Sequence, residues 1–120
     1  MLDHIGLQVS DYAKSKQFYL SALQPLGYAL VKEFGEAGGF GKDGKPDFWI
    51  AQGKATSPAL HIAFVSADRP TVDAFHRAAL AAGARNNGAP GLRPQYHANY
   101  YGAFVLDPDG NNVESVCHRP

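Results

Sequence analysis

Residues 104–114 read Phe-Val-Leu-Asp-Pro-Asp-Gly-Asn-Asn-Val-Glu, an apolar run followed by a tight turn and the start of a second extended segment. Pro108 presets one backbone dihedral angle of such a turn, and Gly110 accepts the positive φ that it requires. The stretch therefore predicts a β-hairpin. Its second strand carries a carboxylate in the middle, Glu114, which is costly to bury without a partner.

The hairpin closes a longer unit that begins with another strand. Leu60, Ile62 and Phe64 alternate with other residues at the two-residue period of a strand. Asp68 then offers a helix cap, and Gly83 stands where the following helix would end. This half is predicted to contain a strand near 60–65, a helix near 70–82 and extended segments near 85–92, 100–106 and 111–117. Within it, segment 86–99 is the least regular and is expected to form a loop over a site.

The first half of the chain has the same order of elements. His4 and His61 lie 57 positions apart, and Gly27 and Gly83 lie 56 apart, which indicates a duplicated unit. A strand near 3–9 and a helix capped by Ser10 or Asp11 are followed by extended segments near 28–34, 37–42 and 47–52. The prediction is a single α+β domain over 1–120, built from two strand–helix–strand–strand–strand (βαβββ) modules at about 1–54 and 57–118.

The composition is that of an ordinary globular domain. Of the 120 residues, 45% are hydrophobic and 18% charged, and Lys plus Arg balance Asp plus Glu at 11 each. We expect no nucleic-acid binding, because nucleic-acid-binding proteins carry a basic surplus, and no membrane span, because no apolar stretch is long enough. The one cysteine, Cys117, cannot form an internal disulfide and is expected to be buried. Without a recognisable signal peptide, the expected location is the cytoplasm.

Strand parity places three metal-binding residue types on equivalent faces. His4 and His61 each point away from the apolar face of their strand, beside the small residues Gly6 and Ala63. If the two modules pack as a pair, these faces and that of Glu114 converge. Two histidines and one carboxylate bind a divalent metal and leave positions open for water or substrate. Taken singly, each histidine is more simply a structural residue, and Glu114 an edge-strand carboxylate.

Asp3-His4-Ile5, Leu60-His61-Ile62-Ala63-Phe64 and residues 104–114 together resemble the vicinal oxygen chelate superfamily. That superfamily includes glyoxalase I, extradiol dioxygenases, fosfomycin-resistance thiol transferases and bleomycin-resistance proteins. The resemblance covers essentially the whole chain. It implies a cupped mixed β-sheet with helices on the outside, surrounding a divalent ion (Fe, Mn, Zn or Ni), with modules often paired across a homodimer. It also implies His4, His61 and Glu114 as the metal ligands.

Glyoxalase I has a fourth protein ligand, from the last strand of its first module. Aligning Asp43-Gly44 with Asp109-Gly110 places Phe48 at that position, and phenylalanine cannot bind a metal. A slip of one residue would bring in Asp47 or Trp49 instead. This departure argues against glyoxalase I activity, and three ligands look more like the dioxygenase and thiol-transferase branches.

The stretch Tyr96-His97-Ala98-Asn99-Tyr100-Tyr101 is expected to complete a substrate pocket. His97 or Tyr96 is the candidate catalytic acid–base group, and Tyr100 a candidate aromatic wall. Phe48 and Trp49 are further pocket candidates, one facing the pocket and the other the core, and periodicity does not decide which.

Two other histidines have simpler interpretations. His76, beside Arg77 on the second predicted helix, is expected to be exposed. His118 lies two residues beyond Glu114 on the same face and is expected either to border the pocket or to be solvated near the chain end.

Three functions remain open. The favoured one is a metal-dependent lyase, dioxygenase or transferase that acts on a small oxygen-bearing molecule. The second is a non-catalytic protein that sequesters a small molecule, as drug-binding members of the superfamily do. The third is a domain whose metal is structural or whose ligand set is vestigial. Because all three ligand positions hold ligand residue types, the enzyme is favoured over the binding protein.

Overall fold

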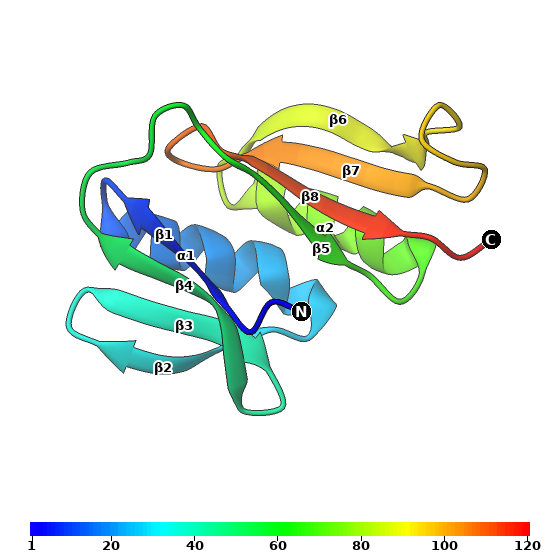
Figure 1. The fold of residues 1–120 in the computed structure, drawn as a ribbon. Coiled ribbons are helices and arrows are strands. Elements are labelled where there is room, and N and C mark those ends of the chain that lie inside the picture. Colours follow the sequence, from blue (N-terminus) through cyan, green and yellow to red (C-terminus); the bar gives the residue numbers. More distant parts are fainter.

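The computed structural model describes residues 1–120 and contains eight strands and two α-helices (Figure 1). The first module comprises β1 (Ile5–Val9), α1 (Tyr12–Leu23), the 3₁₀ turn η1 (Gln24–Leu26), β2 (Ala29–Phe34), β3 (Ala37–Lys42) and β4 (Lys45–Gln52). The second comprises β5 (His61–Val65), α2 (Arg69–Ala81), β6 (Arg85–Leu92), β7 (Tyr101–Leu106) and β8 (Asn112–Cys117). No helix combines the length and the apolar character needed to cross a membrane.

The two modules have the same topology. Their strands form two separate four-stranded sheets with the orders β1-β4-β3-β2 and β5-β8-β7-β6. In each sheet the first strand pairs in parallel with the last, and the other neighbours are antiparallel. The predicted α+β class with two βαβββ modules is confirmed. Within one chain the sheets do not join, so β1 and β5 are each an edge strand.

Capping residues set the ends of both helices. The Asp11 side chain accepts a hydrogen bond from the backbone N–H of Lys14 at 3.1 Å, and the Asp68 side chain caps α2 in the same way through Thr71 at 2.9 Å. After α1 the chain turns at Gly27, whose φ of 85° is accessible to glycine without steric cost.

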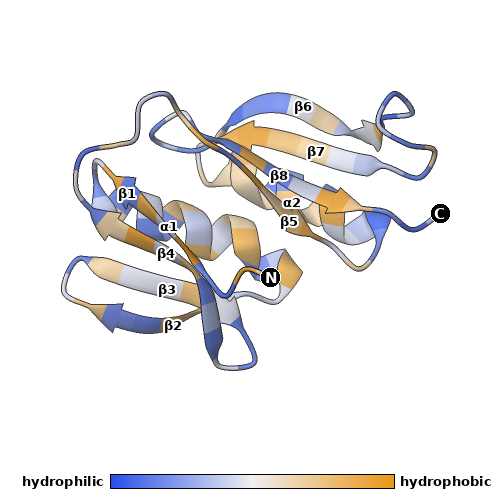
Figure 2. Ribbon diagram, viewed as in Figure 1, coloured by the Kyte–Doolittle hydropathy of each residue, from blue (hydrophilic) through white to orange (hydrophobic).

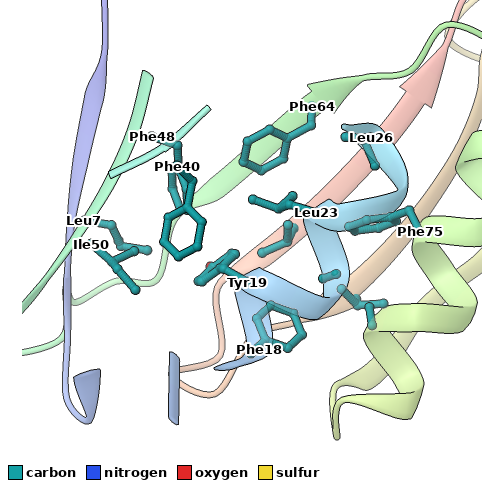
Figure 3. Packing of buried hydrophobic residues seen from close by; sticks show 14 of the residues in the cluster. Leu7, Phe18, Tyr19, Leu23, Leu26, Phe40, Phe48, Ile50, Phe64 and Phe75 are labelled. Atoms are coloured by element: carbon teal, nitrogen blue, oxygen red, sulfur yellow. The ribbon is translucent and has the colours of Figure 1, made fainter. Parts of the chain in front are cut away.

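The hydrophobic core lies between the sheets and includes both helices. A single cluster of 16 buried residues draws on both modules. In Figure 3, Tyr19 and Leu23 of α1 stand between Phe48 of the first sheet and Phe75 of α2. Figure 2 shows the matching hydropathy: β5 and β7 are largely hydrophobic, whereas the outer strand β2 is largely hydrophilic. Each sheet thus buries one face against a helix and leaves the other face open.

The extended segment predicted near 85–92 is confirmed as β6, so the loop predicted over 86–99 is extended in its first half. Its residues up to Leu92 belong to β6, which pairs with β7. The register shifts twice, between Asn86 and Gly88 and between Gly88 and Gly91, so this strand lacks a regular alternation in the sequence. The loop is confined to residues 93–100.

The expected exposure of His76 is wrong, whereas the expected burial of Cys117 is confirmed. His76 is only 8% exposed, because α2 packs against β6. There its Nε2 lies 2.9 Å from Oδ1 of Asn86, a polar partner that the helix sequence alone does not reveal. Cys117 is fully buried.

The turn between β7 and β8 ties the modules together. The Tyr19 hydroxyl on α1 donates to Oδ2 of the buried Asp107 at 2.5 Å. Oδ1 of Asp107 accepts hydrogen bonds from the backbone N–H groups of Asp109 and Asn111 at 2.9 and 2.8 Å. Ser10, at the end of β1, donates to the Asp109 carboxylate. One turn of the second module therefore holds the first helix and the first strand.

Replacing Tyr19 by phenylalanine tests this link. Tyr19→Phe removes a donor from a buried carboxylate, and we expect the free energy of unfolding in urea to fall by about 1–3 kcal/mol. Tyr96→Phe is the matched control, because Tyr96 is 60% exposed and its change should stay within about 0.5 kcal/mol. Equal effects of the two substitutions would contradict this role of Tyr19.

Candidate functional site

Two of the three predicted metal ligands meet on the open face of the second sheet. The parallel pairing of β5 with β8 sets Ala63 opposite Glu114. His61 lies two residues before Ala63 and therefore on the same face of the sheet. Nε2 of His61 lies 3.0 Å from Oε1 of Glu114. The His61 side chain is 51% exposed, whereas that of Glu114 is 1% exposed. A nearly inaccessible carboxylate thus faces an accessible imidazole.

The other nitrogen of His61 settles the ring's tautomer. Nδ1 lies 3.0 Å from the backbone carbonyl oxygen of Asn112, and a carbonyl only accepts, so Nδ1 carries a proton. In the neutral ring, Nε2 then presents a lone pair to a carboxylate oxygen. A proton between these two atoms, on the ring or on the carboxyl group, or a metal ion would satisfy both.

The second oxygen of Glu114 is also engaged. The hydroxyl of Tyr100, at the end of the 93–100 loop, donates a hydrogen bond to Oε2. Burial, followed by this hydrogen bond, raises the pKa of Tyr100 well above its usual range, so the phenol remains a donor at neutral pH.

These residues border a hollow of about 510 Å³. Its walls combine three aromatic rings with an amide, an imidazole and a carboxylate: Tyr96, Tyr100, Phe104, Asn112, His61 and Glu114. A few polar groups among aromatic walls suit a small ligand with an apolar body and polar atoms near the histidine. The predicted pocket residues Tyr96 and Tyr100 therefore lie beside the two ligand candidates.

His97 does not line this hollow. Its Nε2 lies 2.6 Å from Nδ1 of His118, and both rings stand edge-on to the ring of Tyr100. His118, expected to border the pocket or be solvated, is exposed and paired with His97. The structure thus brings His97 next to Tyr100, and His97 makes no hydrogen bond to Glu114 or His61.

His4 lies on the other sheet, just before β1. No group of three or more His, Cys, Asp or Glu residues in the chain is placed to hold a metal ion. Nδ1 of His4 is 2.7 Å from Oδ2 of Asp3, so this nitrogen donates and Nε2 carries the lone pair of the neutral ring, as in His61. Hydrogen bonds from His4 and from Lys45 lower the pKa of Asp3, which therefore stays ionised.

Phe48 and Trp49, the remaining pocket candidates, are adjacent on β4 and therefore point to opposite faces of the sheet. Phe48 is in the core, where its ring packs edge-on against Tyr19 and Phe64, and it also borders a small hollow with His4. Trp49 is the one of the pair that lies outside the core, bordering a hollow with Gly6 and Gln8 of β1. Asp47 accepts a hydrogen bond from Tyr28 at 2.9 Å.

Two site features were missed by sequence reasoning. Phe34 is 67% exposed and stacks on Trp49 with ring centroids 6.3 Å apart, and Gly39 leaves the space that the indole occupies. The glycine pair 38–39 opposite an aromatic residue was the available signal. The hydrogen bond of Tyr100 to Glu114 had no signal in the sequence, because it depends on the course of the 93–100 loop.

Solved structures share this fold over essentially the whole chain. A glyoxalase/bleomycin resistance protein from Albidiferax ferrireducens is 28% identical, with a TM-score of 0.85 over 100% of this chain and 99% of that one. A putative glyoxalase from Bacillus halodurans is 25% identical, with a TM-score of 0.73 over 98% and 95%. A glyoxalase/bleomycin resistance protein/dioxygenase family enzyme from Burkholderia phytofirmans, 19% identical, has a TM-score of 0.76 over 98% of each chain and shows the fold alone.

The family comparison agrees with the resemblance noted in the sequence. No curated protein matches the chain. The model of the glyoxalase/bleomycin resistance protein/dioxygenase superfamily matches residues 1–115, which include His4, His61 and Glu114. With the βαβββ topology of both modules, this match means that the chain belongs to the glyoxalase/bleomycin resistance protein/dioxygenase superfamily.

Proposed function

We propose that the protein is a divalent-metal-dependent enzyme that acts on a small oxygen-bearing molecule, with His4, His61 and Glu114 as ligands. The observation that carries the proposal is shared by both histidines. Each donates its Nδ1–H to an oxygen acceptor, Asp3 for His4 and the Asn112 carbonyl for His61, so that Nε2 carries the lone pair of the neutral ring, which in His61 faces Oε1 of Glu114. Metal-binding histidines are typically oriented in this way by a carboxylate or carbonyl.

The ligand set also fits the ion. Two imidazole nitrogens and one carboxylate suit Fe, Mn, Zn or Ni and occupy one face of the coordination sphere. When bound, the ion would act as a Lewis acid that stabilises negative charge developing on oxygen atoms of the substrate. The chain's own contribution is to orient the ligands and to surround the substrate with Tyr96, Tyr100 and Phe104. Phe48 at the fourth ligand position argues against glyoxalase I itself.

We further propose that two copies of the chain share each site. His61 and Glu114 lie on one sheet, and His4 lies at the start of the other. Strands β1 and β5 are both edge strands, with backbone N–H and C=O groups free to pair or be covered. Exposed Leu2 and Val65 near these edges, 82% and 70% accessible, add apolar surface for a partner copy. A homodimer that sets β1 beside β5 of the second copy would bring His4 to the other two ligands.

With the single cysteine buried, we propose the reducing cytoplasm as the site of action.

Metal content tests the ligand set. After incubation with manganese, iron(II), nickel and zinc and removal of free ions, we expect near-stoichiometric metal in the wild-type protein by elemental mass spectrometry. His61→Ala and Glu114→Gln should lose it, because each removes one ligand. Wild-type protein that retains none of these ions would contradict the proposal that the protein is a metalloenzyme.

Mixed dimers test whether the site is shared. His4→Ala and Glu114→Gln chains should each bind no metal alone. Combined in one dimer, they leave one site with all three ligands, so we expect about half of the wild-type metal content. Light scattering should give twice the chain mass of 12.9 kDa. If all three ligands came from one chain, the mixed dimer would hold no complete site and bind none.

A second function, non-catalytic sequestration of a flat aromatic ligand, is favoured by the stacked pair of Phe34 and the only tryptophan, Trp49. For this function we expect 2-naphthol to quench Trp49 fluorescence in the presence of a chelator. Phe34→Ala should then weaken the binding about 2- to 10-fold, the worth of one aromatic contact. Quenching that requires added metal would instead favour the enzyme.

A further inference from the structure

We infer that Tyr100 is a positioning residue that fixes the Glu114 carboxylate so that one oxygen, Oε1, is left for the metal ion, and that the His97–His118 pair holds Tyr100 in place. This inference rests on the proposed role of His61 and Glu114 as ligands. Tyr100 acts through Glu114 and is not itself a ligand.

The contacts of Glu114 define the position of its carboxylate. Oε1 lies 3.0 Å from Nε2 of His61, and Oε2 accepts the Tyr100 hydroxyl. The side chain is 1% exposed, so water has little access to these oxygens. A carboxylate with one oxygen taken by a strong donor offers the other as a single ligand atom, rather than both together.

A glycine leaves the space for this hydrogen bond. A Cβ atom at Gly102 on β7 would lie 3.1 Å from Oε2 of Glu114 and 3.2 Å from Cε1 of Tyr100. Both contacts are tighter than those usually seen, so a side chain here would press on the phenol and the carboxylate at once. Glycine inside a strand otherwise weakens it, and close approach of other groups is a recognised reason for its presence.

The imidazole rings of His97 and His118 pack against the ring of Tyr100. The backbone N–H of Asn99 donates to Nδ1 of His97 at 3.2 Å, so Nε2 of His97 carries the proton in the neutral ring and donates it to His118. The two rings lie 5.4 and 5.3 Å from the Tyr100 ring, centroid to centroid, in edge-on geometry. His97 belongs to the 93–100 loop, and His118 directly follows β8. The pair therefore links the loop to the strand that carries Glu114 and limits movement of the phenol between them.

Removing the hydroxyl should weaken metal binding without removing a ligand. In Tyr100→Phe, Oε2 of Glu114 loses its donor and the carboxylate can rotate away from the His61 side. Partners that orient metal ligands typically contribute about 10- to 100-fold in affinity, and we expect a loss of that size.

The experiment is calorimetric titration of the metal-free dimer with Ni²⁺ alone and with Mn²⁺ alone. Tyr101→Phe is the matched control: it also removes a hydroxyl that donates to a carboxylate, Asp73 at 2.7 Å, but on the neighbouring residue and away from the site. We expect Tyr100→Phe to lose about 10- to 100-fold in affinity with unchanged stoichiometry, and Tyr101→Phe to bind like the wild type. Thermal unfolding with a chelator present shows whether each variant is folded.

A double-mutant cycle tests the role of the histidine pair. His118→Ala should lower the affinity by itself but add nothing in the Tyr100→Phe background, because both changes act through the same hydroxyl. Additive losses would mean that His118 does not act through Tyr100. This arm also tests the inference if Tyr100→Phe alone fails to fold, since a His118→Ala protein with wild-type affinity would overturn it.

The outcomes separate this inference from the function on which it rests. Wild-type protein that binds neither ion overturns both. Wild-type protein that binds, with Tyr100→Phe indistinguishable from Tyr101→Phe, overturns the positioning role and leaves the metal site standing. Loss of affinity in Tyr100→Phe alone supports both.

Discussion

The buried carboxylate of Asp107 is the contact on which the arrangement of the two modules depends. It accepts hydrogen bonds from the turn of its own module and from the Tyr19 hydroxyl on the helix of the other, at 4% exposure. A polar group so removed from water is stable only while its hydrogen-bond partners stay in place. The relative position of the two open sheet faces, and of the residues on them, follows from this constraint because α1 cannot shift without losing a donor.

Much of the fold could be predicted because local sequence determines it. The Asp11 and Asp68 caps, the turn of residues 107–111 and the period-two apolar strands each indicate one local structure, and the repeat gives their order. The extended segment predicted near 85–92 is β6, but the loop predicted over 86–99 overlapped it, because the register shifts of β6 break the regular alternation on which strand prediction relies. The burial of His76 escaped because its partner, Asn86, comes from that same irregular strand.

In the candidate site, too, the residues placed by local strand structure could be predicted, and those placed by loops or by module pairing could not. The sequence places His61 and Glu114 on one face because strand parity is a local property, and neighbouring strands bring them to 3.0 Å. Whether His4 joins them depends on how modules pair, which no alternation pattern encodes. Tyr100 depends on the path of an irregular loop. Trp49 and Phe48 show the limit most simply: they are adjacent in sequence, and only the structure assigns Phe48 to the core.

The pairing of first strand with last has a consequence for how the chain folds during synthesis. Strand β5 has β8 as its only neighbour, some fifty residues later, so its sheet cannot close until almost the whole chain has left the ribosome. Until then β5 has no sheet neighbour on either side, and its unpaired edges and apolar residues are open to pairing with other chains. Because Glu114 lies on the strand that completes the sheet, the same late step that protects the nascent chain also assembles the pair formed with His61.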